Sequence, residues 1–410
     1  MNDKTGDYSK AIYQTATLFF FQLLVVLLGF FAKGFQTRAL GPELYGLIAL
    51  FGTITGFTVL FFRFGFFASL RTILANNKDQ IKEREFFGTG FIITLCIGAF
   101  YTLFVFIISF WIDGIFNIEF GHVLRLFAPL CFILPFNFLI PALSVGSNKV
   151  HFISIFEVIS IFLFVIPLAV FFLFDGLYVE LIIGLKLLAI IVTTAGLYFA
   201  YKPLFSNLKE RLKEVWQKNR EFGFRYYSGA ILNQTTFKLD EVFITYFINI
   251  SQLGFYTLAN VICSPMVMMS RAFSNALFKK FTDQNKIPLK VFFYNCLWLV
   301  ACIVFLFFCS RLIIELMFGK EYLEVAVYII PLSFAYLLQG LYQPFTFLAA
   351  KSKGKEIRNV AIIEAVFNVI GNLILVPMYG VMGAIWASII AKGIDFFGML
   401  YYYMKYLKHQ

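Results

Sequence analysis

Long apolar stretches alternate with short polar clusters along the whole chain. A helix needs about 20 mostly apolar residues to cross a bilayer, and stretches such as residues 18–31 do not alternate between polar and apolar positions as barrel strands would. The pattern therefore predicts an all-α integral membrane protein with about 12 transmembrane helices. The predicted helices cover residues 12–36, 43–70, 87–111, 122–145, 152–174, 177–201, 222–247, 254–278, 290–314, 324–349, 357–377 and 381–404.

Positive charge is divided unevenly between the two sides of this predicted bundle. If the N-terminus lies inside, the termini and loops on that side hold 23 of the 34 Lys and Arg residues, and the opposite loops hold only Arg38 and Lys320. Cytoplasmic loops of membrane proteins carry an excess of Lys and Arg. Both termini are therefore expected in the cytoplasm. The first apolar stretch is too long for a cleaved signal peptide and is expected to stay as an anchor.

Composition changes the picture mainly by what it excludes. Hydrophobic residues make up 60% of the 410 residues and charged residues 14%, against about 45–50% and 25% in soluble domains. These values exclude a cytosolic enzyme, a disulfide-built secreted domain and a disordered scaffold. Because the net charge of +11 is a topology signal, no nucleic-acid partner is expected. The six cysteines show no metal-like spacing and are expected to be apolar, reduced thiols.

The predicted helices fall into two halves that start on the same side of the membrane. We predict an N-terminal six-helix lobe over residues 1–201, a basic cytoplasmic linker over 202–221, and a C-terminal six-helix lobe over 222–410. Two parallel lobes around a central cavity are a common transporter plan. Local matches at an offset of 206–208 residues support a duplication, and they pair Gly46 with Gly254, Arg63 with Arg271, Lys149 with Lys355, and Glu157 with Glu364.

The first two predicted helices of each lobe carry a narrow polar stripe. A helix turns by about 100° per residue, and at this period each stripe includes a cation. Charged groups inside a bilayer normally face a protein interior or a wet cavity. The candidate substrate-binding residues taken from these stripes are Lys33, Arg63, Arg225, Asn233, Asn260 and Arg271.

Two interpretations of these cations stay open. Cations that face a cavity would hold an anionic headgroup, most simply a diphosphate, while it crosses the membrane. Alternatively, Arg63, Arg225 and Arg271 lie in the cytoplasmic third of their helices, where their side chains would reach the inner headgroups. The symmetric positions of Arg63 and Arg271 in the two halves favour the first interpretation.

Acidic residues within the predicted helices are candidates for coupling transport to an ion. Asp240 and Glu364 are the leading candidates, and Glu157 and Asp395 are further carboxylates of this kind. Each could take up a proton, although pairing with a neighbouring cation is the simpler account. For the face of the eleventh helix that holds Glu364, interhelical packing is the favoured interpretation; its members are Glu364, Asn368, Gly371 and Asn372.

The usual signatures of catalysis are missing from the sequence. No Gly-rich segment ends in Gly-Lys-Ser or Gly-Lys-Thr, as a phosphate-binding loop would. His122, His151 and His409 lie far apart in sequence, which argues against a His-based metal centre or proton relay. The predicted outer loops are too short to form a water-exposed active site. We therefore expect no enzyme activity, no cofactor and no bound metal.

Four sequence segments resemble one known family. They are residues 37–46 (TRALGPELYG); residues 63–66 (RFGF) with Arg71; Asp240 followed by residues 253–256 (LGFY); and residues 368–387 with the core VPMYGVMGA. Together they are similar to Wzx-type polysaccharide and O-antigen flippases of the multidrug/oligosaccharidyl-lipid/polysaccharide exporter superfamily. The similarity covers both predicted lobes, and the last segment is the most specific.

This resemblance implies a V-shaped pair of six-helix lobes in a bacterial inner membrane, open alternately to each side. It implies transport of an undecaprenyl-diphosphate-linked oligosaccharide from the inner to the outer leaflet for O-antigen, capsule or exopolysaccharide synthesis. The cations would handle the diphosphate and sugars while the lipid tail stays in the bilayer. The implied partners are this lipid-linked substrate, membrane lipids, a polysaccharide polymerase and glycosyltransferases.

The resemblance also has departures, and two other classes of function compete with it. Lipid II flippases usually have fourteen helices, and their eighth helix usually has an Arg after a Tyr-Ala pair, where this chain has Asn260. Export of repeat units is therefore favoured over export of peptidoglycan precursors. A cation-coupled multidrug antiporter of the same superfamily should have a carboxylate on its first helix, which here has Lys33 and no acid. An enzyme of the glycan pathway would need a water-exposed site.

Overall fold

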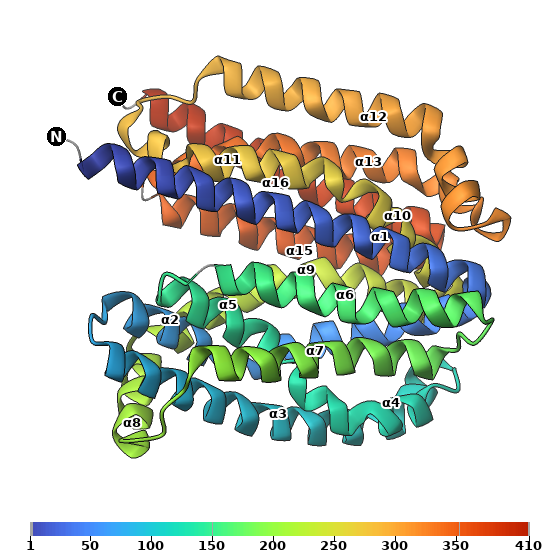
Figure 1. Ribbon diagram of the computed structural model, residues 1–410. Coiled ribbons are helices and arrows are strands. Elements are labelled where there is room, and N and C mark those ends of the chain that lie inside the picture. The colour runs from blue at the N-terminus through green and yellow to red at the C-terminus, as the bar shows by residue number, and fades with distance from the viewer. Residues whose placement is uncertain (1–2, 150, 352, 409–410) are drawn as a thin grey trace. The chain divides into compact units, whose positions relative to one another are not determined.

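The protein is all-helical, as the apolar stretches predict. The computed structural model describes residues 3–149, 151–351 and 353–408, with side chains except at 3–19, 229–230, 232–237, 275–276, 278–280 and 282–283. Over these ranges, nine helices are long and apolar enough to cross a membrane, or ten if Ile250–Cys263 and Pro265–Ser274, bent by 42°, form one span. This makes the chain a multi-pass membrane protein (Figure 1).

The span count falls below twelve partly because the first candidate span is unusually long. Phe20–Phe62 has 43 residues, about twice the length that one crossing needs. It consists of α1 (Asp3–Thr58) from Phe20 onward and of the short 3₁₀ helix that follows, Val59–Phe62. In α1, Gly41 breaks the helix with φ 70° and ψ 175°, a conformation that glycine adopts readily. In Figure 1 the dark-blue and lighter-blue stretches of α1 run in opposite directions. Thus α1 contains the first predicted helix and the first part of the second, residues 43–58.

The number of candidate spans is also below twelve because α9 (Phe224–Phe247) is polar. Within the residues that the structure describes, α9 contributes no candidate span, and its C-terminal half holds Lys238, Asp240 and Glu241. Charged residues lower the mean hydropathy of a segment even where a protein interior solvates them. The seventh predicted helix is therefore present as a helix, but a hydropathy criterion does not identify it as a span.

Four predicted helices are interrupted rather than continuous. The second predicted helix breaks after Phe62, the fourth at a 3₁₀ segment, the eighth at Pro265 and the tenth at a 3₁₀ turn. The breaks thus fall in the second and fourth helices of each half, which agrees with an internal repeat. The pieces are η1 (Val59–Phe62), α2 (Phe66–Asn76), α4 (Gly121–Phe127), η2 (Ala128–Ile133), α5 (Phe136–Gly146), α10 (Ile250–Cys263), α11 (Pro265–Asp283), α13 (Val325–Tyr342), η5 (Gln343–Phe345) and α14 (Thr346–Ala350).

The other elements are long helices and short connections. They are α3 (Gln80–Phe116), α6 (His151–Leu173), α7 (Val179–Tyr201), α8 (Leu208–Lys218), the π-helical turn η3 (Asn219–Gly223), α12 (Leu289–Met317), η4 (Lys320–Tyr322), α15 (Gly354–Tyr379) and α16 (Val381–Lys408).

The chain divides into two compact units. Unit 1 contains residues 1–40 and 51–234, and unit 2 contains residues 41–50 and 235–410. The predicted linker, residues 202–221, lies within unit 1, and the start of the second predicted helix lies within unit 2. The predicted lobe boundaries at 201 and 222 stay a prediction.

In unit 1 the basic linker is bound to the start of α3 by a buried ion pair. The Nε of Arg211 on α8 lies 2.9 Å from Oε2 of Glu85, and the two side chains are 10% and 5% exposed. Glu85 also accepts hydrogen bonds from Ser206 (3.0 Å) and Asn207 (2.9 Å). Burial alone would lower the pKa of Arg211, but the charge of Glu214 and the bond to Glu85 raise it above its ordinary value. The linker is therefore a docked element.

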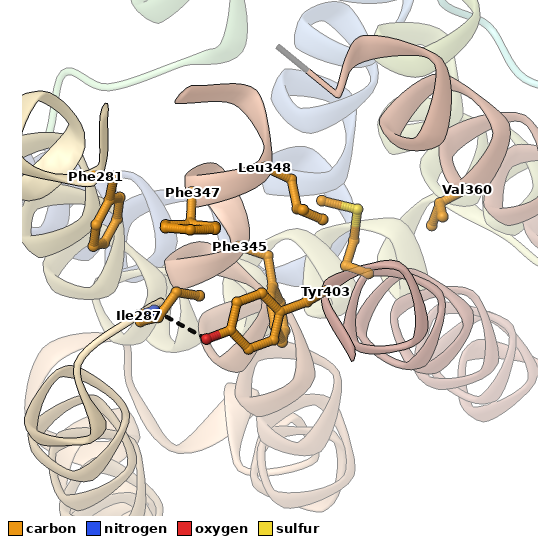
Figure 2. Close-up of a cluster of buried hydrophobic side chains, with 8 residues drawn as sticks. Phe281, Ile287, Phe345, Phe347, Leu348, Val360 and Tyr403 are labelled. Carbon is orange, nitrogen blue, oxygen red and sulfur yellow. Dashed lines mark hydrogen bonds between the residues drawn. The ribbon is translucent and has the colours of Figure 1, made fainter. Parts of the chain in front are cut away.

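In unit 2 a cluster of aromatic and aliphatic side chains fixes the connection between α11 and α12 (Figure 2). Ile287, in this connection, is 4% exposed and packs in the cluster. Its backbone N–H donates to the hydroxyl of Tyr403 on α16 at 2.9 Å. Phe345 and Phe347 contribute rings from η5 and α14. Because both the side chain and the backbone of Ile287 are held, the start of α12 has a defined position.

Candidate functional site

Asp240, one of the two leading acidic candidates, lies in unit 2 where α9 meets three other helices. It is 5% exposed and accepts three hydrogen bonds from side chains on α10, α16 and α15: from Tyr256 Oη (2.8 Å), Ser388 Oγ (2.7 Å) and Asn372 Nδ2 (2.7 Å). A buried carboxylate is costly unless such donors surround it. Asp240 therefore ties α9 to three neighbouring helices.

Glu364, the second acidic candidate, lies on α15 two turns before Asn372 and is held in a buried ion pair. Its Oε1 lies 2.8 Å from Nζ of Lys392 on α16, and the two side chains are 3% and 10% exposed. Asn368 lies one turn from each of Glu364 and Asn372, and its backbone carbonyl accepts a 2.9 Å bond from Asn372. The two carboxylates thus belong to one polar layer between α15 and α16. Both have partners within unit 2.

Close packing of α15 against α16 supports this layer. A Cβ added to Gly383 would lie 2.0 Å from the carbonyl oxygen of Leu375, and one added to Gly371 would lie 3.0 Å from Cβ of Ala387. Small residues that let two helices approach closely are typical of membrane helix interfaces. The packing interpretation of the Gly371 face is therefore supported, and the asparagines of the same face add hydrogen bonds.

In unit 1 the candidate cation Arg63 lies in the break between η1 and α2. The break has left-handed backbone at Phe64 (φ 46°) and Gly65 (φ 82°). The half-buried guanidinium of Arg63 lies 4.3 Å from the ring centroid of Phe138 on α5, a favourable cation–π distance. Arg63 therefore projects from an irregular turn rather than from the regular helix that the sequence predicts over 43–70. The physical reason is the left-handed pair, which a helix cannot contain.

The other candidate substrate-binding residues are distributed over both units. Lys33 on α1 is half-buried and Arg225 on α9 is exposed, both in unit 1, while Arg271 on α11 is exposed in unit 2. Asn260 on α10 accepts a 3.0 Å bond from the hydroxyl of Tyr336 and donates to the carbonyl of Tyr256 at 3.1 Å. The side chain of Asn233 lies outside the described residues. A shared role for these six residues stays a prediction.

Two residues that complete the buried polar layer, Ser388 and Lys392, are not among the candidates from the sequence, and Tyr256 is named there only within the segment LGFY. Tyr256, Ser388 and Lys392 are the partners of Asp240 and Glu364. One signal was available: Ser388 and Lys392 are four residues apart and share a face of α16 among alanines. Their partners lie on other helices, and no periodicity within α16 reveals those contacts.

Comparison with solved structures places this fold among known membrane transporters. An inward-facing multidrug resistance MATE family transporter of the MOP superfamily matches with a TM-score of 0.74 and 15% identity, covering 93% of this chain and 96% of that one. The lipid II flippase MurJ, in an inward closed conformation, matches with a TM-score of 0.70 and 15% identity over 94% of this chain and 87% of that one.

A further match is a MOP superfamily transporter from Pyrococcus furiosus with a binding pocket of reversed polarity, at a TM-score of 0.61 and 16% identity, covering 97% of this chain and 96% of that one. At these identities the likeness establishes the two-lobe MOP superfamily fold.

No curated protein sequence matches the chain. The family model described as "Polysaccharide biosynthesis protein" matches residues 36–327, well over half of the chain. The chain therefore belongs to this family of polysaccharide biosynthesis proteins, and its fold is that of the MOP superfamily transporters.

Proposed function

We propose that the protein is a flippase that moves an undecaprenyl-diphosphate-linked oligosaccharide from the inner to the outer leaflet of the bacterial cytoplasmic membrane. One contrast within the lobes carries this proposal. The acids Asp240 and Glu364 are buried and bonded within unit 2, whereas the side chains of Arg225 and Arg271 are exposed. Exposed guanidinium groups on helices of a membrane protein suit an anionic substrate such as a diphosphate.

In this proposal the chain works by alternating access and catalyses no covalent step. The lobes would open in turn to the two sides, with Lys33, Arg63, Arg225 and Arg271 contacting the diphosphate and sugars, and Asn260 adding a polar contact. The lipid tail would remain in the bilayer. The positive-inside asymmetry supports cytoplasmic termini. A polysaccharide polymerase and glycosyltransferases are the proposed partners.

A second candidate, a cation-coupled multidrug antiporter, is favoured by the likeness to a MATE family transporter at a TM-score of 0.74. Such a protein binds cationic compounds and therefore needs accessible carboxylates. Asp240 and Glu364 already bond to neighbouring side chains in unit 2, and residues 12–36 contain no acid. Coupling through either carboxylate would first require the present bonds to be broken. The family match to polysaccharide biosynthesis also supports the flippase.

The proposal is tested in cells by the double variant Arg63→Ala with Arg271→Ala. We expect surface polysaccharide to be lost and lipid-linked repeat units to accumulate, while the protein remains inserted and abundant. Arg358→Ala is the matched control, because Arg358 is an exposed arginine at the start of α15. Normal polymer from the double variant would contradict the cation role. Unchanged polymer together with drug sensitivity after gene deletion would support the antiporter, as would the absence of neighbouring glycosyltransferase and polymerase genes.

A further inference from the structure

A groove lies between α11 and α12 in unit 2. It has a volume of about 480 Å³, within the roughly 300–1,000 Å³ typical of ligand sites. Its walls are apolar and partly aromatic, with Phe273 on α11 and Tyr294 and Trp298 on α12. Trp298 also donates its indole N–H to the carbonyl of Met266 at 3.0 Å, which holds the ring in place. The groove is therefore a shaped site rather than a flat lipid-exposed surface.

The groove and the candidate cation Arg271 lie on opposite faces of α11. Met269, Phe273 and Leu277 recur every fourth residue and line the groove. Arg271 lies about 160° around the helix from the centre of this stripe. A single helix thus separates an apolar groove from a polar face, as required for a lipid whose chain stays in the bilayer while its headgroup contacts cations.

One end of the groove carries a positive charge. Lys290, the second residue of α12, lines the groove and its side chain is exposed. It lies three residues after Ile287, which the cluster of Figure 2 fixes in place, so the position of the charge at the groove end is defined. On the predicted topology this end is cytoplasmic, at the level of the inner-leaflet headgroups. A phosphate at Lys290 would be complementary in charge.

The length of the groove matches one leaflet. From Lys290 to Ala301, the two ends of its α12 wall, the helix rises about 16 Å, roughly half of a hydrocarbon core of about 30 Å. A second groove, between α13 and α16, is lined by Ile330, Phe334 and Trp386 among other apolar residues and by no charged residue. The α11–α12 groove is therefore distinguished by combining an apolar wall with a cation at its end.

We propose that this groove holds the first isoprene units of the substrate's polyprenyl chain, with the phosphate nearest the chain at Lys290. The inference rests on the proposed flippase function and adds a lipid-binding site to it. Isoprene units carry methyl branches and double bonds, whose bulk and flat faces fit a wide aromatic groove better than a straight acyl chain does.

The test measures binding of undecaprenyl diphosphate, without sugar, to the full-length protein in nanodiscs of phosphatidylethanolamine and phosphatidylglycerol. Ala301→Phe fills the deep end of the groove and should weaken binding about tenfold or more. Its control is Ala195→Phe, the same change at an exposed alanine of α7. Lys290→Gln should weaken binding about fivefold. Its control is Lys355→Gln, at the second and exposed residue of α15. Binding by Ala301→Phe equal to that of the wild type would overturn the proposal.

A second measurement does not depend on the folding of Ala301→Phe. A photoreactive benzophenone residue replaces Leu297, which lines the groove and is 56% exposed. Mass spectrometry of the illuminated protein should show an adduct with undecaprenyl diphosphate. Adducts with phosphatidylglycerol alone would show an ordinary phospholipid site and overturn the proposal. The flippase function is tested separately. Loss of polymer in the Arg63 and Arg271 double variant would support it even if the groove bound no undecaprenyl diphosphate.

Discussion

Gly46 and Gly254 lie against each other in unit 2. A Cβ on Gly254 would be 3.4 Å from Cα of Gly46, and a Cβ on Gly46 would be 2.3 Å from the carbonyl oxygen of Ile250. Each glycine is the fifth residue of its helical stretch, counted from Pro42 in α1 and from Ile250 in α10. The two positions were matched from the sequence as equivalents in the repeat. The two helices therefore meet at glycines that the predicted repeat pairs, and this contact lies within unit 2, to which residues 41–50 belong.

Gly46→Ala should destabilise the protein, because the added methyl group cannot fit without moving the backbone of α10. We expect a loss of about 1–3 kcal/mol, measured as a lower thermal unfolding midpoint in detergent. Gly52→Ala, in the same helix with nothing within 4 Å of its added Cβ, is the control and should change stability by less than about 1 kcal/mol. Equal midpoints for the two variants would refute the close contact.

Asp240→Ala should lower stability by about 3 kcal/mol or more, because three buried donors lose their acceptor. Ser388→Ala removes only one of the three donors and should cost about 1 kcal/mol. Chemical or thermal unfolding of both variants measures the two losses of stability. A smaller effect for Asp240→Ala than for Ser388→Ala would mean that the carboxylate does not organise this network.

The Glu364 and Lys392 pair should behave as a buried ion pair. Glu364→Leu or Lys392→Met alone leaves one buried charge and should cost about 3–5 kcal/mol. The double variant should be more stable than either single variant, because it removes both charges. Additive losses in the double-mutant cycle would show that the two groups do not interact.

The docked linker of unit 1 gives a prediction about accessibility. Arg211→Met removes the ion pair with Glu85 and should loosen α8 from the start of α3. Limited proteolysis with trypsin should then cleave within residues 202–218 faster than in the wild type, while Lys209→Met, at an exposed position of the same helix, should leave the cleavage rate unchanged. Equal cleavage in both variants would argue that other contacts hold the linker.

The sequence alone could predict features that depend on local composition. Apolar length predicts an all-helical membrane protein, which the structure confirms, and the predicted repeat pairs Gly46 with Gly254, which lie in contact. Two kinds of feature could not be predicted. The break at Phe64 and Gly65 depends on left-handed backbone, which neither residue type requires. The bond between Ser388 and Asp240 joins residues 148 positions apart, and such pairing depends on tertiary packing.

The central claim is tested most directly by reconstituting the purified protein in vesicles that contain an undecaprenyl-diphosphate-linked oligosaccharide. The rate at which the oligosaccharide becomes accessible to an external lectin should rise with the wild-type protein. With Arg63→Ala and Arg271→Ala together, that rate should fall to the level of protein-free vesicles. A wild-type protein that leaves the rate unchanged while driving uptake of a cationic drug would contradict the account.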